Sequence, residues 1–296
     1  MKGKERFFYS ALHPVTIAVY LLGQIVLGMF IMHPIFVGIS LFFSILLCFA
    51  VCGKDFLKEL KIYIPFYVIV AVSNPLFSHS GITPLFFLNG KPITYEAIIY
   101  GIVSSGMFLS VLLWCRVWSA VMTEEKLVYL IGKKLPKLGL VLSVSFRMIP
   151  RFRQKWREIK EVQTTFSGDE KGFVDQIKAA LSLFSALVTH AMESSIETGM
   201  SMAARGFGEK GRTSLILYKF RKRDAAFLTV NLCLLAAIVV GIAYGAVRFD
   251  YYPSLSPVVS GRMATGVFCL FAAQSALLLL QEIKEEVVWR FSRSKI

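Results

Sequence analysis

The sequence has few of the side chains that carry chemistry in enzymes. Its four histidines are far apart along the chain, and its five cysteines are scattered, mostly within apolar runs. Cys48 and Cys52 lie one helical turn apart, but no set of His or acidic partners beside them completes a metal site. No glycine-rich phosphate loop ending in Lys-Ser or Lys-Thr occurs, so we expect this chain not to bind ATP itself. These absences argue against an enzyme and against a metal or cofactor in this chain.

Acidic side chains are scarce as well, and this imbalance limits what the chain can be. It carries 33 Lys and Arg against 19 Asp and Glu, while 55% of its 296 residues are hydrophobic and the mean hydropathy is +0.61. A chain this apolar is not an ordinary soluble domain, and its long uncharged stretches predict an all-α integral membrane protein. Hardly any acid falls in mid-span, so the sequence indicates no ion pathway and favours a scaffold over a channel or a secondary transporter.

Six apolar stretches predict about six transmembrane helices, at residues 14–32, 34–52, 62–73, 95–121, 225–247 and 263–282. Lys and Arg gather at the N-terminus, between the second and third stretches, in the central segment and in the C-terminal tail. The other loops hold only Lys91, Arg248 and Arg262. The positive-inside rule therefore predicts a multi-pass protein of the cell membrane, with both termini and the central segment in the cytoplasm. No small-residue cleavage site closely follows the basic N-terminus, so we expect the first span to be retained.

These predictions divide the chain into three regions. They are a four-span N-terminal region at residues 1–121, a cytoplasmic or interfacial region at 122–224, and a two-span region with a basic tail at 225–296. Between the third and fourth spans, Asn89-Gly90 supplies the positive φ of a type I′ turn. A small β-hairpin is therefore predicted over residues 85–91.

The first half of the central region predicts helices with an apolar and a basic side. Residues 121–145 mix apolar runs with three lysines, as expected of a helix that lies along the membrane surface. Pro150, preceded by Arg147, predicts the start of a further helix, because proline suits the first helical turn. Apolar residues then recur at three- and four-residue spacing among basic ones, so residues 150–166 predict a basic amphipathic helix. Adhesion to anionic lipid headgroups is one interpretation of such a helix.

A second long helix is predicted from Phe173 to Arg205, and two stripes along it indicate packing or docking. Small residues that let another backbone approach closely recur at every fourth position: Ala191, Ser195, Gly199 and Ala203. Beside them runs an adaptable apolar stripe, which suits either core packing or a partner surface: Met192, Ile196 and Met200. A glycine within a helix costs roughly 1 kcal/mol relative to Ala, and close contact would give Gly199 a physical reason. We therefore predict two long helices that cross or pack closely.

The end of this second helix presents a cation. Ala204 and Arg205 precede Gly206, which can take the left-handed conformation that ends a helix, and Phe207 can fold back on Met202. An Arg at this end suits the negative pole of the helix dipole. The segment is either an ordinary helix end with a solvated Arg or a tip that docks into a partner.

The same segment resembles a known family. Residues 201–213 are similar to the second Ala-Arg-Gly motif in the transmembrane T component of energy-coupling factor (ECF) transporters, in the run Ser201-Met202-Ala203-Ala204-Arg205-Gly206-Phe207-Gly208 and then Gly211-Arg212-Thr213. The run at residues 147–150 and the loop at 81–93 with its Asn-Gly turn also resemble that family. The resemblance covers nearly the whole chain in topology, but it is specific in motif only at residues 147–150 and 201–213.

The resemblance implies a scaffold that joins two cytoplasmic ABC-type ATPases to a small substrate-binding membrane subunit, the S component. In that family two long coupling helices end in Ala-Arg-Gly-like tips, and each tip docks in a groove of one ATPase. Motion driven by ATP then passes to the substrate-binding subunit, for uptake of a vitamin or a transition-metal ion. The docking role would fall here on Ala204, Arg205, Gly206 and Phe207, with ATP and Mg²⁺ on the ATPases and no cofactor in this chain. Membrane lipid is a further expected partner, and nucleic acid is not.

The chain departs from the family pattern at the first tip. The corresponding stretch contains Thr165, Phe166 and Ser167, with Phe166 about where the Arg would fall. A Phe cannot make the charged hydrogen bonds of a guanidinium, although it can fill an apolar pocket. The two ATPase contacts are therefore predicted to be chemically unequal, which would suit two non-identical ATPases.

Two alternatives stay open. The first is a conventional ABC importer permease that lines its own pathway, which the long two-helix cytoplasmic segment disfavours. The second is a membrane-anchored protein whose basic helix at residues 150–166 binds anionic lipid or nucleic acid.

Overall fold

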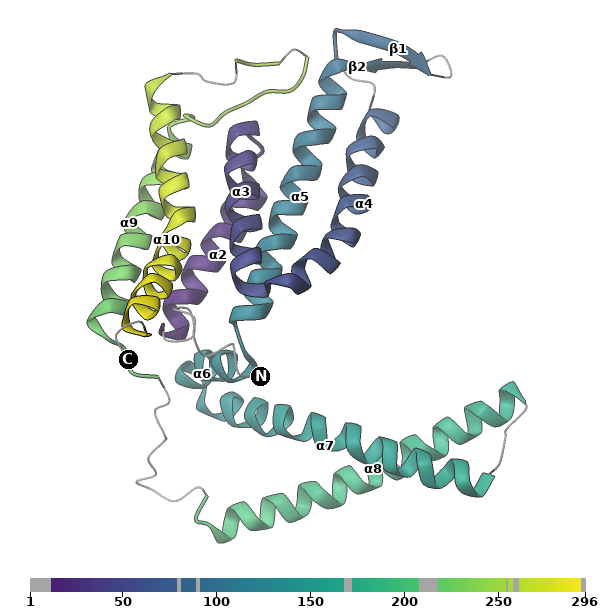
Figure 1. Cartoon of the computed structure of the whole chain (residues 1–296). Helices are drawn as coiled ribbons and strands as arrows, with labels where there is room; N and C mark the ends of the chain where they lie inside the picture. The colour runs from purple at the N-terminus through teal and green to yellow at the C-terminus, as the bar shows by residue number, and fades with distance from the viewer. Residues whose placement is uncertain are drawn as a thin grey trace. The chain divides into compact units, whose positions relative to one another are not determined.

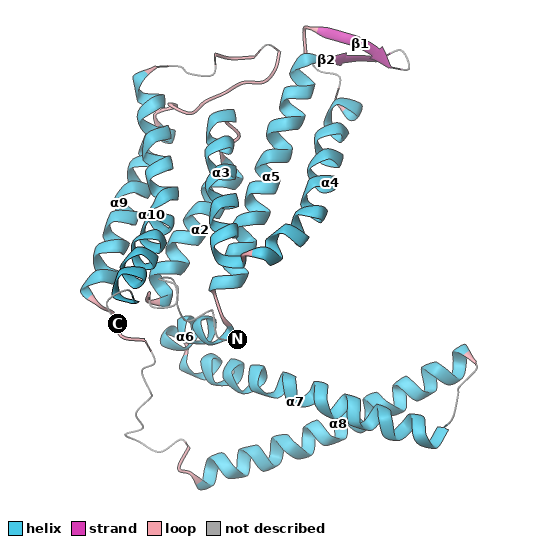
Figure 2. Ribbon diagram, viewed as in Figure 1, coloured by secondary structure: helices cyan, strands magenta, loops and turns pink. Residues whose placement is uncertain are grey.

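The computed structural model describes residues 12–78, 81–88, 91–167, 172–207, 218–253, 255–257 and 261–293. Within these ranges the chain forms nine helices and a two-stranded hairpin, so the predicted helical architecture is confirmed (Figures 1 and 2). The chain divides into two compact units. The bundle unit comprises Met1–Thr123 and Tyr218–Ile296, and the α6–α8 unit comprises Glu124–Leu217.

Five helices of the bundle unit are long and apolar enough to cross a membrane. They are α3 (Pro34–Cys52), α5 (Tyr95–Val121), α9 (Lys222–Ala243), the Phe56–Phe77 part of α4 (Lys54–Phe77) and the Arg262–Gln281 part of α10 (Arg262–Arg293). The helix α2 (Pro14–Phe30) is apolar as well, but its 17 residues extend only about 25 Å, less than a hydrocarbon core of about 30 Å. In the described part of the chain the structure therefore indicates a multi-pass membrane protein with five long apolar helices, one fewer than the six predicted spans.

Two histidines act as helix caps where α2 and α3 begin. His13 caps α2 and His33 caps α3, because Nδ1 of each accepts a hydrogen bond of 3.3 Å from the backbone N–H two residues later. Pro14 and Pro34 follow at the first helical positions, where the missing N–H of proline leaves no hydrogen bond unmade. Both histidines therefore have a structural role at a span end.

The helix α4 is longer than predicted. The sequence placed the third span at residues 62–73, whereas α4 has 24 residues and continues through Pro65 and Pro75. Prolines are tolerated in membrane helices, because neighbouring groups can satisfy the backbone carbonyls that lose a partner. An ion pair joins this helix to α5: Nε and Nη2 of Arg116 donate to the two carboxylate oxygens of Glu59, at 2.7 and 2.6 Å.

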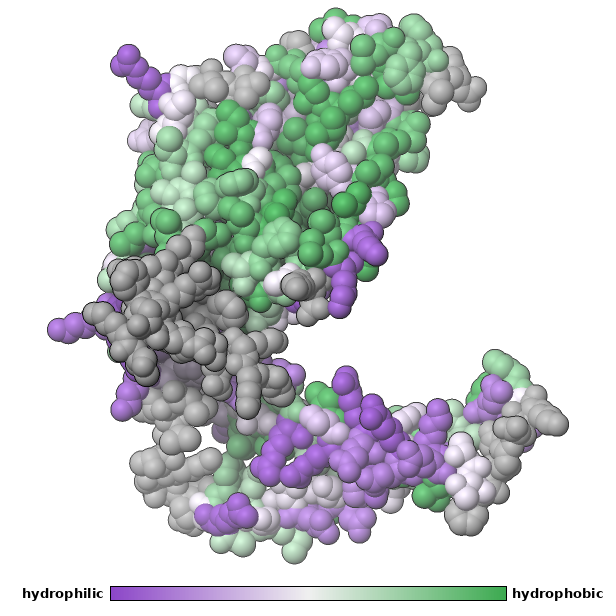
Figure 3. Space-filling model, viewed as in Figure 1, coloured by the Kyte–Doolittle hydropathy of each residue, from purple (hydrophilic) through white to green (hydrophobic). Residues whose placement is uncertain are grey.

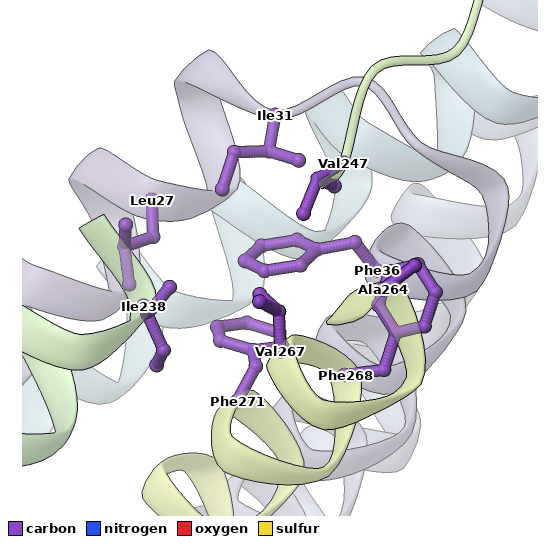
Figure 4. Close-up of a cluster of buried hydrophobic side chains, with 9 residues drawn as sticks. All are labelled: Leu27, Ile31, Phe36, Ile238, Val247, Ala264, Val267, Phe268 and Phe271. Carbon is purple, nitrogen blue, oxygen red and sulfur yellow. The ribbon is translucent and has the colours of Figure 1, made fainter. Parts of the chain in front are cut away.

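The core of the bundle unit joins helices that are far apart in the sequence. Phe36 of α3 and Phe271 of α10 stack with their ring centroids 3.6 Å apart. Seven further buried side chains surround this pair, as Figure 4 shows: Leu27, Ile31, Ile238, Val247, Ala264, Val267 and Phe268. The helices α2 and α3 are thus packed against α9 and α10.

Buried amide and hydroxyl groups connect the same helices. Gln274 Nε2 donates to Asn231 Oδ1, and Ser275 Oγ donates to Gln24 Oε1, both at 3.2 Å. The Tyr20 hydroxyl donates to the carbonyl of Ser275 at 3.0 Å. Hydrogen bonds between helices help to fix their register in lipid, where van der Waals packing is the other main source of association. These residues were not predicted from the sequence, because isolated amides in apolar runs form no motif.

The predicted β-hairpin is confirmed between α4 and α5. The strand β1 (Pro84–Leu88) pairs antiparallel with β2 (Lys91–Thr94), and Leu88 lies opposite Lys91. This register leaves Asn89 and Gly90 as the connection, and these two residues lie outside the described ranges.

The second unit contains α6 (Glu124–Lys134), α7 (Pro136–Ser167) and α8 (Phe173–Ala204). The prediction of one surface helix over residues 121–145 is wrong, because α6 ends before Leu135 and a new helix begins at Pro136. The prediction that Arg147 and Pro150 begin a helix is wrong too, since both lie inside α7. Pro136 takes the first helical turn, which suits its fixed φ, and Pro150 removes only one backbone donor from α7.

Candidate functional site

The C-terminal end of α8 is fixed by backbone hydrogen bonds. Gly206 has a left-handed φ of 75°. Its N–H donates to the carbonyl of Ala203, and the N–H of Phe207 donates to the carbonyl of Met202, both at 3.0 Å. This pair of bonds is the Schellman arrangement. The predicted helix stop at Gly206 and the return of Phe207 to Met202 are therefore confirmed for the backbone.

Arg205 is presented at this end. Its backbone N–H donates to the carbonyls of Ser201 and Met202 at 3.2 Å, which fixes the main chain. Its side chain is exposed and forms no ion pair or hydrogen bond with any other residue that the structure describes. A guanidinium has five N–H donors, and the negative end of the helix dipole stabilises it here. Ala204 and Gly206 on either side are exposed as well, so an acceptor surface can approach this cation closely.

The end of α7 holds the other predicted tip. Thr165 is exposed, and its hydroxyl donates to the carbonyl of Glu161 at 2.9 Å. Phe166 and Ser167 continue the helix to its last residue. Their side chains lie outside the described part of the chain, so the difference between Phe166 and Arg205 stays a prediction.

The helices α7 and α8 cross as predicted (Figure 1). Near the end of α7, Gln163 Nε2 donates to the carbonyl of Ala179 near the start of α8, at 3.1 Å. Toward their other ends the two helices line a groove of about 490 Å³. Its walls are mainly apolar: Leu140, Val141, Val144, Ser145, Met148, Ile149 and Phe152 from α7, and Ser195, Thr198, Gly199 and Met202 from α8. The two helices therefore run antiparallel.

The small-residue stripe does not make the predicted close contact with the residues that the structure describes. A Cβ at Gly199 would meet nothing within 4 Å, and Ser195 and Gly199 line the groove instead. The most buried side chain of α8 is Leu183, at 4% exposure, and it does not belong to the small-residue stripe. Of the other stripe residues, Ala191 is half-buried and Ala203 is exposed.

The apolar stripe beside it is exposed. Met192, Ile196 and Met200 have exposed fractions of 64%, 64% and 68%. The stripe continues at helical spacing toward the start of α8 through Ile177, Leu181, Phe184 and Val188, which are also exposed. These seven residues form the α8 stripe. Core packing against the described residues does not account for it.

The helix α7 differs from α8 in that it is strongly basic. It contains seven Lys and Arg and only two acids. Arg147, which we expected at a helix start, is exposed midway along it. Lys155 Nζ lies 3.1 Å from Glu158, and this contact, with a hydrogen bond from Gln154, holds the pKa of the Glu158 carboxyl below its usual range. Figure 3 shows hydrophilic residues gathered over part of this unit and hydrophobic residues over most of the visible bundle.

A pair of glycines that the sequence analysis did not single out sets the turn from α6 into α7. A Cβ at Gly139 would lie 2.5 Å from the Cα of Gly132. The two backbones can therefore approach this closely only because both residues lack side chains. The signal was present in the sequence, since the glycines stand on either side of Leu135-Pro136 at a seven-residue separation.

The described ranges contain no cluster of three or more His, Cys, Asp or Glu that could hold a metal ion. In comparisons with known proteins, no family model and no curated protein matches the chain.

Proposed function

We propose that this chain is the transmembrane coupling scaffold of an ECF-type ABC importer. It would pass the motion of two cytoplasmic ATPases to a separate substrate-binding membrane subunit that takes up a vitamin or a transition-metal ion. The observation that carries the proposal is found on α8. One helix combines an exposed apolar stripe with an exposed arginine on a rigid end.

The length and rigidity of α8 suit the transfer of motion. Its 32 residues extend about 48 Å at 1.5 Å per residue. A force applied to Arg205 at one end would therefore move the whole α8 stripe, because the Schellman bonds leave little freedom at the tip. The ATPase would bind Ala204, Arg205, Gly206 and Phe207, and the substrate-binding subunit would bind the stripe. Methionines suit a surface of this kind, because their side chains adapt to a moving partner.

The end of α7 would dock the second ATPase. Thr165, Phe166 and Ser167 are the last residues of that helix, as Arg205 follows the last residue of α8. An aromatic group at one tip and a guanidinium at the other would select different grooves. Two non-identical ATPases would satisfy both.

The proposal includes a topology. The helix α2 would be the sixth span, and both termini and the α6–α8 unit would face the cytoplasm of a cell membrane. The support is the distribution of Lys and Arg, since segments rich in these residues face the cytoplasm. Cysteine labelling from outside intact cells tests it: Ser80→Cys, in the sequence between α4 and β1, should react, and Ser167→Cys should not.

The experiment that tests the coupling role is co-purification from detergent, with the bound proteins identified by mass spectrometry. We expect wild type to retain two ABC-type ATPases and a small membrane subunit, and Arg205→Glu to lose at least the ATPase that binds α8. Arg151→Glu is the matched control, because it makes the same charge change at an exposed position of α7. Loss of ATPase in both variants, or in neither, would contradict a specific role of Arg205.

The same experiment separates the scaffold from a conventional permease. A conventional permease would co-purify with ATPases but without an additional small membrane subunit. If wild type retains no ATPase at all, the coupling role is wrong.

A further inference from the structure

One edge of α7 combines exposed apolar side chains with unpaired cations. Ile149, Arg153, Trp156 and Lys160 recur at three- and four-residue spacing, so they share one side of the helix, and Arg157 flanks them. We call these five residues the Trp156 edge. The exposed fractions of Ile149 and Trp156 are 45% and 38%, and Ile149 lies where this edge borders the groove between α7 and α8.

The three cations of this edge have no partner among the residues that the structure describes. Arg153, Arg157 and Lys160 are all exposed, and no ion pair or side-chain hydrogen bond joins them to another described residue. The acid of α7 that does form an ion pair, Glu158, is held by Lys155 and Gln154. The positive charge of the Trp156 edge is therefore not neutralised by these contacts.

The alternation of apolar and cationic groups matches the chemistry of a membrane surface. An indole prefers the level of the lipid headgroups, where its ring is in an apolar layer and its N–H meets polar groups. Arg and Lys beside it can bury their hydrocarbon stems and direct their charges to phosphates. An acidic protein surface would attract the cations but would not require Ile149 and Trp156 to be exposed between them.

Chain connectivity keeps this helix near a bilayer. Only Met122 and Thr123 separate the membrane span α5 from α6, and only Leu135 separates α6 from α7. The 11 residues of α6 extend about 16 Å. The start of α7 is therefore tethered by a short length of chain to the end of α5.

We propose that the Trp156 edge binds the headgroups of anionic phospholipids. The proposal does not rest on the coupling function, because it uses neither helix tip nor the α8 stripe. It gives the basic side of α7 a role in addition to the proposed docking at its end, because this side would bind the membrane surface while α8 presents its apolar stripe and Arg205.

The test uses the full chain in lipid nanodiscs and measures quenching of Trp156 fluorescence. The discs contain phosphatidylcholine with brominated acyl chains and an increasing fraction of phosphatidylglycerol. The chain has four tryptophans, so the signal of Trp156 is taken as the difference between wild type and Trp156→Phe. We expect quenching to rise with the fraction of phosphatidylglycerol and to fall with added salt.

Two double variants of the same helix test which cations are responsible. Arg153→Gln with Arg157→Gln removes two charges from the Trp156 edge, and Arg147→Gln with Arg151→Gln removes two charges at the same spacing from another side of α7. Each Lys or Arg near an anionic membrane strengthens binding about fivefold, so the first pair should weaken it about thirtyfold. The first pair should therefore need much more phosphatidylglycerol for half-maximal quenching, and the second should remain close to wild type.

Three results would overturn the proposal. They are no quenching of Trp156 in any disc, quenching that does not depend on phosphatidylglycerol, or equal losses in the two double variants. The third result would mean that total charge, and not this edge, attracts the lipid. Elution of each variant as a single species in size-exclusion chromatography would show that a lost signal does not come from misfolding.

Discussion

The helices α7 and α8 have 32 residues each and cross within one unit, yet their charge differs sharply. The first contains seven Lys and Arg and two acids, and the second contains one Lys and three acids. The exposed residues of α8 include seven large apolar side chains in one stripe, whereas α7 exposes cations around a tryptophan. Two helices of equal length and common packing thus offer one surface for charge and one for apolar contact. The proposed roles, lipid binding by α7 and docking of the substrate-binding subunit by α8, depend on this difference.

The largest expected effect comes from adding a charge to the α8 stripe. Under the proposed function, Ile196→Glu should abolish retention of the substrate-binding subunit, because burial of an unpaired carboxylate in an apolar interface costs several kcal/mol. The ATPases should remain, since Arg205 is unchanged. Ala186→Glu is the control, because it introduces the same charge at an exposed position outside the stripe.

Co-purification of the partner subunits measures both variants. Retention of the membrane subunit by Ile196→Glu would mean that the α8 stripe is not its docking surface. Loss of the ATPases in the same variant would mean that the two surfaces of α8 do not act separately.

The next largest effect is a loss of stability, and it should distinguish two leucines of α8 that are two residues apart. Leu183 is 4% exposed and Leu181 is 62% exposed. Leu183→Ala should destabilise the α6–α8 unit by about 2–5 kcal/mol, because it removes buried methyl groups and leaves a cavity. Leu181→Ala should change stability by less than about 0.5 kcal/mol in the purified chain. Limited proteolysis across α7 and α8 measures both, and equal protection in the two variants would contradict the packing described here.

The spans and the end of α8 could be predicted from the sequence. The spans can be predicted from the apolar runs and from the positions of Lys and Arg. Lipid requires long apolar helices, and this requirement does not depend on which other helices pack against them. The end of α8 was predictable for a similar reason: Gly206 supplies a conformation that few other residues adopt, and the Schellman bonds follow locally.

The packing of α7 and α8 was harder to predict than the existence of the two helices. Pro150 and Pro136 give the same local signal for a helix start, and only tertiary context shows that one of them lies inside α7. Spacing alone also could not show that Gly199 faces open space, because a small residue fits equally beside a helix or beside a groove. The exposed state of Met192, Ile196 and Met200 depends on where α7 lies, which no local pattern of α8 determines.

The smallest expected effects are changes in stability when two glycines, Gly139 and Gly199, are each replaced by Ala. A Cβ at Gly139 would lie 2.5 Å from a backbone atom of Gly132, so Gly139→Ala must shift α6 against α7 and should cost about 1–3 kcal/mol. A Cβ at Gly199 meets nothing within 4 Å, so Gly199→Ala should stabilise the purified chain by up to about 1 kcal/mol through helix propensity. Thermal unfolding of both variants in detergent measures these opposite signs.

The Gly199→Ala variant also tests the partner surface. If a partner helix approaches this position closely, the added methyl group should weaken retention of the membrane subunit even though the chain alone becomes more stable. A variant that is both more stable and fully able to retain the subunit would show that Gly199 is not part of a close interface. In that case the α8 stripe would bind through Met192, Ile196 and Met200 alone, because their flexible side chains can accommodate a partner without close approach of the two backbones.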